Sequence, residues 1–354
     1  MTIRRFKAER FRCLTSADVE LASDYNVVYG DNASGKTSFL EALAYLGRGK
    51  SFRGAPTQAL IQHGCKNFVL FGRVDKGGRE IGVGVENGPD GLAARIDNES
   101  GGASDLAGAL PLQIIDPDVH NLVAGGPEQR RRFIDWIAFH VEHGYVELWR
   151  QFRRALKQRN AGLRSPAMRH SLGAWDAEYV RLSKAVDAAR RRTLESASDV
   201  LARQSENLLE GGISFEYSQG WASGLELEEA LASSVERDIQ HGSTQTGPHR
   251  ADLKLRYDER QAKRLVSRGQ QKLLACSMVL AATEVVQDAL GQRVLLLLDD
   301  PAAELDRAAL ARLLDQSFGL GCQLVATSLE KNTLNFPQTP RRFHVEHGVI
   351  SAVK

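Results

Sequence analysis

Hydrophobic and polar residues alternate along the first 120 or so residues in a way that predicts short strands joined by turns. FVLFGRVD (residues 68–75) and EIGVGVEN (80–87) read as paired strands, AARIDNES (93–100) continues them, and PLQIIDPD (111–118) reads as a buried strand that ends at a turn. A helix with apolar spacing at Phe39, Leu40, Leu43 and Leu46 follows the short apolar strand at 25–29. This part of the chain is therefore expected to be α/β.

From about Pro127 the pattern changes to helical spacing. Residues 128–164 carry Phe133, Ile137, Val146, Phe152 and Leu156 at intervals typical of helices, and residues 171–211 form a second long helical stretch with little Gly or Pro. ELEEALASSVERDIQHG (226–242) is again helical. Alternation returns at ADLKLRYD (251–258), and the chain ends in an expected hairpin across His347 and Gly348.

These segments predict an α/β unit interrupted by a mostly helical insertion. We expect one domain from residues 1–122 together with 244–354, and a compact helical lobe from 123–243. The insertion is too short for a long coiled-coil arm.

Composition indicates a soluble, cytoplasmic globular protein. The chain has 354 residues, 42% hydrophobic and 25% charged, and the aliphatic run at 294–298 is too short to span a bilayer. The N-terminus lacks the apolar segment of a signal peptide, and the four cysteines have no metal-binding spacing. The net charge of +2 hides a basic segment at 129–164 and an acidic one at 204–238.

GDNASGKT (Gly30–Thr37) fits the phosphate-binding loop G-x-x-x-x-G-K-[ST], in the required place between a strand and a helix. The glycines allow the backbone to wrap around phosphate, Lys36 supplies a charge for the outer phosphates, and the Thr37 hydroxyl can ligate Mg²⁺. The motif predicts a bound nucleotide with Mg²⁺, but kinases, GTPases, transporters and DNA machines all share it, and ATP is indicated only by the resemblance described below. The predicted ATP-binding residues are Gly30, Asp31, Asn32, Ala33, Ser34, Gly35, Lys36, Thr37 and Ser38.

RVLLLLDD (293–300) is a buried strand that delivers two carboxylates to its end, as a Walker B segment does. Asp299 is predicted to hold Mg²⁺ with Thr37, and Asp300 to orient the attacking water, with Lys36 and Asp300 as the catalytic pair. Gln113 is a further candidate on the metal side of the site, or simply a strand residue. Upstream, Ser267, Arg268, Gly269 and Gln270 begin an apolar helix, where a serine hydroxyl and free N–H groups can meet phosphate or act as an ordinary cap.

The order of these motifs resembles the ABC-type ATPase head, and the particular version resembles the RecF family. GDNASGKTSFLEALAYLGRGKSFR, GGPEQRRRFIDW, LKQRNAGLR, TGPHRADL, LVSRGQQKLL and LLLLDDPAAELD are the matching segments, and they span nearly the whole chain. The resemblance implies an ABC-type P-loop ATPase head with an inserted helical lobe. It also implies an ATP-dependent homodimer that clamps double-stranded, gapped or junction DNA and acts with RecR- and RecO-like mediator proteins in recombinational repair.

By the same resemblance, Arg12 reaches the nucleotide, Ser267–Gln270 act on the ATP of the partner subunit, and Asp306 belongs to a D-loop that contacts the opposite site. Asp300 stands where most ABC proteins have glutamate, and Thr327 and Ser328 occupy the place of the switch histidine, so we expect slow hydrolysis. An ABC transporter subunit, an SMC-like chromosome scaffold and a metabolic kinase are the alternatives.

DNA is expected on basic residues of the insertion, through phosphate contacts: Arg130, Arg131, Arg132, Arg153, Arg154, Lys157, Arg159 and Arg164. The roles of His249 and Arg250 stay open.

Overall fold

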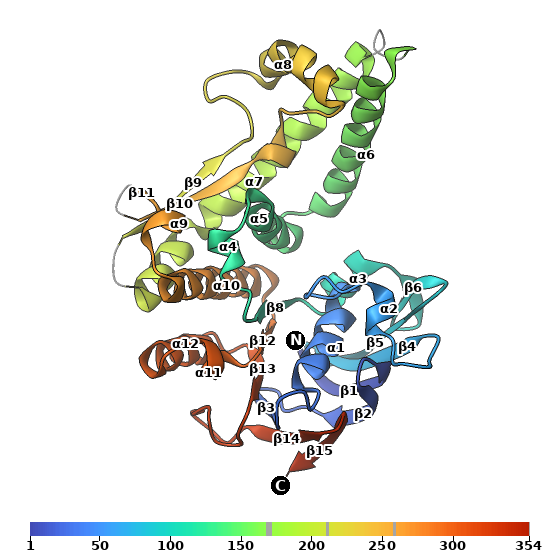
Figure 1. Cartoon of the computed structure of the whole chain (residues 1–354), viewed down its shortest axis with the longest axis vertical. Coiled ribbons are helices and arrows are strands. Elements are labelled where there is room, and N and C mark those ends of the chain that lie inside the picture. Colours follow the sequence, from blue (N-terminus) through green and yellow to red (C-terminus); the bar gives the residue numbers. More distant parts are fainter. Residues whose placement is uncertain (168–171, 210–211, 258–259, 354) are drawn as a thin grey trace. The chain divides into compact units, whose positions relative to one another are not determined.

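The computed structural model describes residues 1–167, 172–209, 212–257 and 260–353, which form two compact units. Unit 1 consists of residues 1–119 and 276–354, and unit 2 of residues 120–275. Figure 1 shows the elements of each unit, coloured along the sequence.

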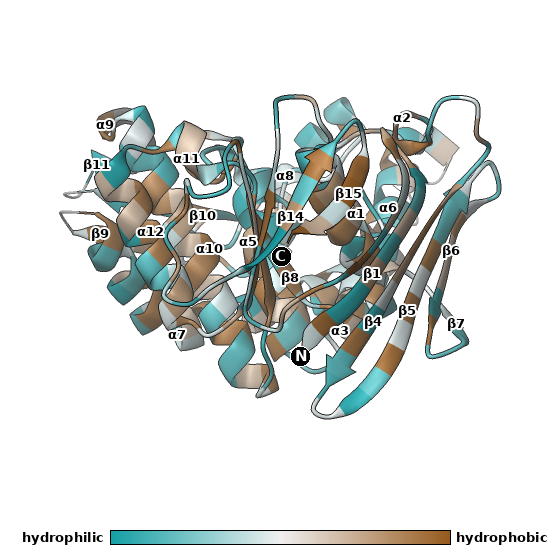
Figure 2. Cartoon of the chain, turned by 90° about the horizontal axis from the view of Figure 1, so that it is seen from below, coloured by the Kyte–Doolittle hydropathy of each residue, from teal (hydrophilic) through white to brown (hydrophobic). Residues whose placement is uncertain are grey.

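Unit 1 contains two six-stranded sheets. The first is antiparallel, in the order β2-β1-β4-β5-β6-β7. Its strands are β1 (Thr2–Phe11), β2 (Leu14–Glu20), β4 (Phe68–Lys76), β5 (Arg79–Gly88), β6 (Gly91–Ile96) and β7 (Glu99–Gly101). Figure 2 shows hydrophobic and hydrophilic residues alternating along these strands, which confirms the strand pattern expected for residues 68–100.

The second sheet has the order β15-β14-β3-β13-β12-β8 and is parallel except for β15. Its strands are β3 (Tyr25–Tyr29), β8 (Leu112–Ile115), β12 (Leu295–Leu298), β13 (Gln323–Ser328), β14 (Arg341–Glu346) and β15 (Val349–Val353). All residues of β12 and β13 are buried, as is usual for the central strands of a parallel sheet. The C-terminal hairpin turns at His347 and Gly348, as expected.

Helix α1 (Lys36–Arg48) belongs to the apolar core that joins the two sheets. Ten of its thirteen residues are buried, and Phe39 packs edge-on against Phe6 of β1 with ring centroids 5.4 Å apart. The same core includes Leu297 of β12 and Val325 of β13, so the helix that carries the phosphate-binding motif is fixed by both sheets. The other helices of unit 1 are α2 (Thr57–Leu60), α3 (Ala103–Ala109), α11 (Pro301–Glu304) and α12 (Arg307–Gly319).

Unit 2 is mostly helical, as predicted, and contains a small sheet. The helical stretch expected at 128–164 is interrupted between Val141 and Tyr145, where Gly144 precedes the second helix with a φ of 77°. The helices of unit 2 are α4 (Asn121–Ala124), α5 (Pro127–Val141), α6 (Tyr145–Arg164), α7 (Leu172–Leu208), α8 (Leu227–His241), η2 (Pro248–Arg250) and α9 (Ala262–Leu265). The sheet has the order β11-β10-β9, from β9 (Ile213–Ser218), β10 (Asp252–Tyr257) and β11 (Arg260–Gln261).

The unit boundaries differ from the expected ones at residues 120–122 and 244–275, which belong to unit 2 and not to the α/β domain. Strand β10 pairs with β9 along its whole length, and the segment before it is held by side chains of α6 and α7, so these residues pack within unit 2. Helix α10 (Arg268–Leu290) contains the boundary between the units. It is the one helix in the described part of the chain that is long and apolar enough to cross a bilayer, and 72% of its apolar window is buried inside the protein.

Candidate nucleotide-binding site

The phosphate-binding loop connects β3 to α1 and leaves little space around its glycines. Gly30 has a φ of 156°, and a Cβ there would lie 2.3 Å from the carbonyl oxygen of Val345. Gly35 has a φ of 120°, in the region that favours glycine, and Ala33 also has a positive φ of 63°. The loop is closed by a bond from the Gly348 N–H to the Ser34 carbonyl, 2.9 Å long. The predicted loop is therefore present, with Asp31, Asn32 and Ala33 exposed.

Lys36 lies inside this loop. Its side chain is buried, and its Nζ donates to the carbonyl oxygens of Gly30 and Asp31 at 2.7 and 2.9 Å. Both acceptors belong to the loop that would surround the phosphates, so the ammonium group already stands at the centre of the loop. A phosphate oxygen can replace a carbonyl as its partner without a large movement of the lysine.

The second part of the site is the hydroxyl–carboxylate pair of Thr37 and Asp299. Thr37 Oγ1 donates to Asp299 Oδ1 over 3.0 Å, and Thr327 Oγ1 donates to the same oxygen over 2.9 Å. Burial raises the pKa of Asp299 above its ordinary value, whereas the two threonine hydroxyls lower it. Hydroxyl and carboxylate oxygens are the ligands that Mg²⁺ prefers, so Thr37 and Asp299 fit a magnesium ion.

Asp300 and Thr327 are joined at the end of the same two strands. The Asp300 N–H donates to Thr327 Oγ1 over 2.8 Å, and Asp300 has a left-handed φ of 46°. A non-glycine residue in this region is strained and is held there by its surroundings. Thr327 thus touches both acids of the Walker B segment from the position where a switch histidine would stand.

The structure does not support Gln113 as a metal ligand. Gln113 is level with Leu296 in the parallel register, three residues before Asp299, which corresponds to roughly 10 Å along a strand. It is buried, and its Oε1 accepts from Arg48 Nη2 at 3.4 Å. We therefore withdraw Gln113 from the metal side of the site.

Asp116 is the residue that follows β8 at the level of Asp299. The Asp299 N–H donates to the Ile115 carbonyl over 2.9 Å, next to Asp116. Burial, together with the nearby charges of Asp118 and Asp299, raises the pKa of Asp116 to about 6. Sequence reasoning missed Asp116, although its signal, an acid directly after a buried strand, was the one that identified Asp299.

Arg12 lies at the turn between β1 and β2, with a φ of 52°. The neighbouring Cys13 Sγ is 3.3 Å from Ser38 Oγ on α1, so this turn lies against the start of the P-loop helix. Arg12 itself forms an ion pair with Glu41 of α1. Arg53, in the loop after α1, is near enough for its positive charge to lower the pKa of Asp299.

Ser267 and Gln270 form a reciprocal cap at the start of α10. The Ser267 N–H donates to Gln270 Oε1 over 2.8 Å, and the Gln270 N–H donates to Ser267 Oγ over 3.3 Å. Ser267, Arg268 and Gly269 are exposed. Asp306 is also a helix cap: its Oδ1 accepts from the N–H groups of Ala308 and Ala309, both at 2.9 Å. Both segments therefore have a structural role that sequence alone could not separate from a functional one.

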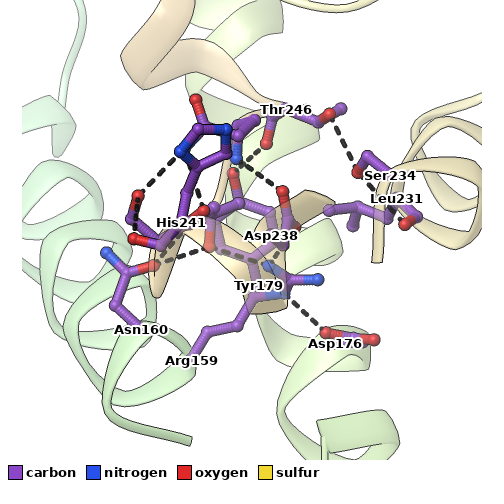
Figure 3. Close-up of polar contacts among 12 residues, drawn as sticks. Arg159, Asn160, Asp176, Tyr179, Leu231, Ser234, Asp238, His241 and Thr246 are labelled. Atoms are coloured by element: carbon purple, nitrogen blue, oxygen red, sulfur yellow. Dashed lines mark hydrogen bonds and ion pairs between the residues drawn. The ribbon is translucent and has the colours of Figure 1, made fainter. Parts of the chain in front are cut away.

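Arg159 is not available for DNA, contrary to the expectation. Its side chain is 0% exposed; Nε donates to Asp176 and Nη1 to Asp238, each over 2.7 Å. Figure 3 shows this arginine pointing into the cluster formed by Asp176, Tyr179 and Asp238. Arg130 is likewise buried, in a bidentate ion pair with Asp252. Both are structural ion pairs, and we remove them from the predicted DNA surface.

The remaining basic residues differ in their exposure. Arg131 is half-buried and donates to the Ala251 carbonyl over 2.7 Å, Arg132 pairs with Glu128, and Arg164 donates to the Gly242 carbonyl. Arg153, Arg154 and Lys157 are exposed on α6 at spacings of three and four residues, which places them on one face of the helix. These three form the α6 basic face.

His249 lies in the segment from Thr244 to Asp252. Its Nε2 is 2.8 Å from the Thr244 carbonyl, and because a carbonyl only accepts, Nε2 carries the hydrogen. Burial lowers the pKa of His249 to about 4, so the ring is neutral near pH 7. The adjacent Arg250 is exposed and donates to Gln245 Oε1 over 2.7 Å.

Comparison with known proteins agrees with this geometry. A family model described as the RecF/RecN/SMC N terminal domain matches residues 2–351. The DNA replication and repair protein RecF of Yersinia pestis bv. Antiqua (strain Angola) is 39% identical over 355 residues, covering 99% of this chain and 98% of the relative. That of Cellvibrio japonicus (strain Ueda107) is 36% identical over 362 residues and covers 99% of each chain.

Two kinds of solved structure share the fold. The structure of the recombination mediator protein RecF-ATP in the RecFOR pathway matches with a TM-score of 0.89 at 22% identity, covering 100% of this chain and 98% of that one. The SmcHead bound to the C-winged helix domain of ScpA matches with a TM-score of 0.61 at 15% identity, covering 100% and 97%. The fold is thus that of ABC-type ATPase heads of the RecF and SMC class. Within that class, the chain belongs to the RecF family.

Proposed function

We propose that the chain is an ATP-dependent DNA-binding protein of recombinational repair. The observation that carries the proposal is the hydrogen bond between Thr37 and Asp299, which joins a complete phosphate-binding loop to a Walker B carboxylate. Thr37 and Asp299 would hold Mg²⁺, which supplies positive charge to the phosphates. Lys36 would bind the outer phosphates, and Asp300 would orient water.

ATP binding drives formation of a homodimer on duplex, gapped or junction DNA. In this dimer the exposed Ser267, Arg268 and Gly269 of one subunit meet the ATP of the other, and slow hydrolysis leads to release. RecF relatives are named for DNA replication and repair, and a RecF structure with ATP is placed in the RecFOR pathway. These names support a repair protein that acts with RecR- and RecO-like partners, and the proposal places it in the cytoplasm, where it helps to load recombinase at gaps.

Sedimentation velocity with Mg-ATP, with and without a gapped duplex, tests this proposal. The wild type should dimerise with ATP, whereas Ser267→Arg should remain monomeric because a bulky cation replaces the small hydroxyl at the helix start. Ser243→Arg, a change at a partly exposed serine of unit 2, is the matched control and should dimerise normally. A wild type that hydrolyses ATP as a monomer in the presence of DNA would instead indicate a self-contained enzyme.

Slow hydrolysis is tested separately by the turnover number. We expect less than about 1 s⁻¹, below the ordinary range for enzymes. Asp300→Asn should abolish the remaining hydrolysis while leaving ATP-dependent dimerisation in place. Fast turnover in the wild type would exclude ATP binding as a slow timer for the clamp.

A further inference from the structure

Glu41 is a fully buried carboxylate on the P-loop helix. It lies one helical turn after Thr37, and its side chain is 0% exposed. An ionised carboxylate in such a place is strongly disfavoured unless several donors compensate for the lost water. Arg12 Nη2 donates to Glu41 Oε1 over 3.0 Å, Arg12 Nε contacts Oε2, and Ser51 Oγ donates to Oε1 over 2.5 Å. Both carboxylate oxygens are therefore in use.

The geometry of the ion pair leaves one nitrogen of Arg12 available. The pair uses Nε and Nη2, which lie on one side of the guanidinium group, whereas Nη1 has no protein partner among the residues that the structure describes. The Arg12 side chain is 23% exposed. A guanidinium held in this way keeps two N–H donors of Nη1 for another acceptor.

Arg12 lies in a turn beside the P-loop. The turn that contains Arg12 contacts α1 through Cys13 and Ser38, and a Cβ added at Gly35 would lie 3.1 Å from Cys13 Sγ. The Arg12 N–H donates to the Leu60 carbonyl over 2.7 Å, which fixes the residue in its left-handed conformation. Backbone strain of this kind persists only where surrounding contacts hold the residue in place, and it is common at ligand-binding sites.

Ser51 extends the same arrangement to the loop after α1. Its Oγ accepts from the N–H groups of Arg53 and Ala55, both at 3.1 Å, while it donates to Glu41. The exposed Arg53 is thereby tied to the carboxylate that holds Arg12. One buried glutamate consequently fixes two cationic segments that lie beside the P-loop helix.

We propose that Glu41 is a positioning residue for nucleotide binding: it holds Arg12 through Nε and Nη2 so that Nη1 donates to the phosphate chain of ATP. The inference rests on the proposed ATP site and adds to it a residue that does not touch the nucleotide. Arg12 makes the contact, and Glu41 sets its orientation.

The test is calorimetric titration of the full chain with Mg-ATP. Arg12→Lys keeps the positive charge beside Glu41 but loses the second nitrogen, and Glu41→Gln keeps the shape of the side chain but loses its charge. Each should weaken ATP binding by about tenfold or more, as expected for one charge-assisted hydrogen bond. The double variant should be no weaker than the weaker single variant, because both changes remove the same contact. Arg5→Lys, on strand β1 before the turn that carries Arg12 and paired with exposed Asp18, is the matched control and should bind like the wild type.

The outcomes distinguish a failure of the proposed ATP site from a failure of the positioning role of Glu41. If the wild type does not bind ATP, the proposed function and this inference both fail. If the wild type binds ATP and both single variants bind equally well, or if their losses add in the double variant, the ATP site stands and the positioning role is refuted. Thermal unfolding of each variant checks the fold; if Glu41→Gln is partly unfolded at the titration temperature, Arg12→Lys against Arg5→Lys decides.

Discussion

Replacing Arg159 by methionine should strongly destabilise unit 2. The side chains of Arg159 and Asp238 are both 0% exposed and are joined by a 2.7 Å ion pair, and Arg159 Nη1 also donates to Thr244 Oγ1 over 2.8 Å. Methionine replaces the aliphatic part of the arginine side chain but not its guanidinium group. The main cost is the uncompensated Asp238 carboxylate, and breaking a buried pair in this way costs roughly 3–5 kcal/mol.

Urea unfolding followed by tryptophan fluorescence measures this loss directly. The four tryptophans of the chain (Trp136, Trp149, Trp175 and Trp221) all belong to unit 2, so the signal reports on that unit. With a slope of about 2 kcal/mol per M, the midpoint should fall by about 2 M. The matched control is Arg154→Met on the same helix, where exposure predicts a change within about 0.5 kcal/mol.

A double variant tests whether the unpaired charge of Asp238 causes this loss of stability. Arg159→Met combined with Asp238→Asn removes the charge that the single variant leaves unpaired, so part of the lost free energy of unfolding should return. If the free energy of unfolding of Arg159→Met lies within about 1 kcal/mol of the wild-type value, Asp238 does not need Arg159 to compensate its charge. The assignment of Arg159 as a structural residue would then be refuted.

Three further predictions concern DNA, pH and the P-loop. Alanine at all three residues of the α6 basic face should weaken DNA binding and reduce the slope of log affinity against log salt by up to about 3; an unchanged slope, measured by fluorescence anisotropy, would place the DNA elsewhere. The unfolded state takes up a proton on His249 as pH falls from about 6.5, whereas the folded state does so only near pH 4, so stability decreases over this window by up to about 3 kcal/mol. His249→Gln should flatten that decrease in urea unfolding at each pH, and an identical pH profile would contradict the assignment. Gly348→Ala should lower the thermal midpoint, because φ is 75° and a Cβ would lie 2.1 Å from the Cys13 carbonyl oxygen; an unaltered midpoint would show that the turn can move.

The nucleotide site was largely predictable because its signals are local. A loop motif between a strand and a helix, and acids at the end of an apolar strand, can be read within a dozen residues each. The parallel register then brings the ends of β3, β12 and β13 to one edge of the sheet. Gln113 lies three residues before the level of Asp299, too far along its strand to share an ion with it, whereas Asp116 directly follows the strand end.

The basic residues show where sequence alone was insufficient. Arg154 and Arg159 belong to one basic helix, but Arg159 follows Phe152 by seven residues and therefore lies on the buried face of α6, whereas Arg154 does not. The apolar periodicity of the helix therefore indicates that Arg159 is buried. It does not identify the partner of Arg159, because Asp238 is 79 residues away and only the fold brings it close.

The segment from Thr244 to Asp252 explains why the domain boundary was also misplaced. Its carbonyl groups are bound by side chains of two helices, α5 and α7: Tyr179 donates to the Thr246 carbonyl and Arg190 to the Pro248 carbonyl, each over 2.6 Å, and Arg131 to that of Ala251. A segment without regular hydrogen bonding keeps one conformation only if such donors satisfy its backbone. Several arginines of the basic region are thus used to build unit 2, and the count of basic residues overstates the surface that DNA can contact. The α6 basic face and Arg250 remain exposed, so the DNA-binding experiment is best directed at them.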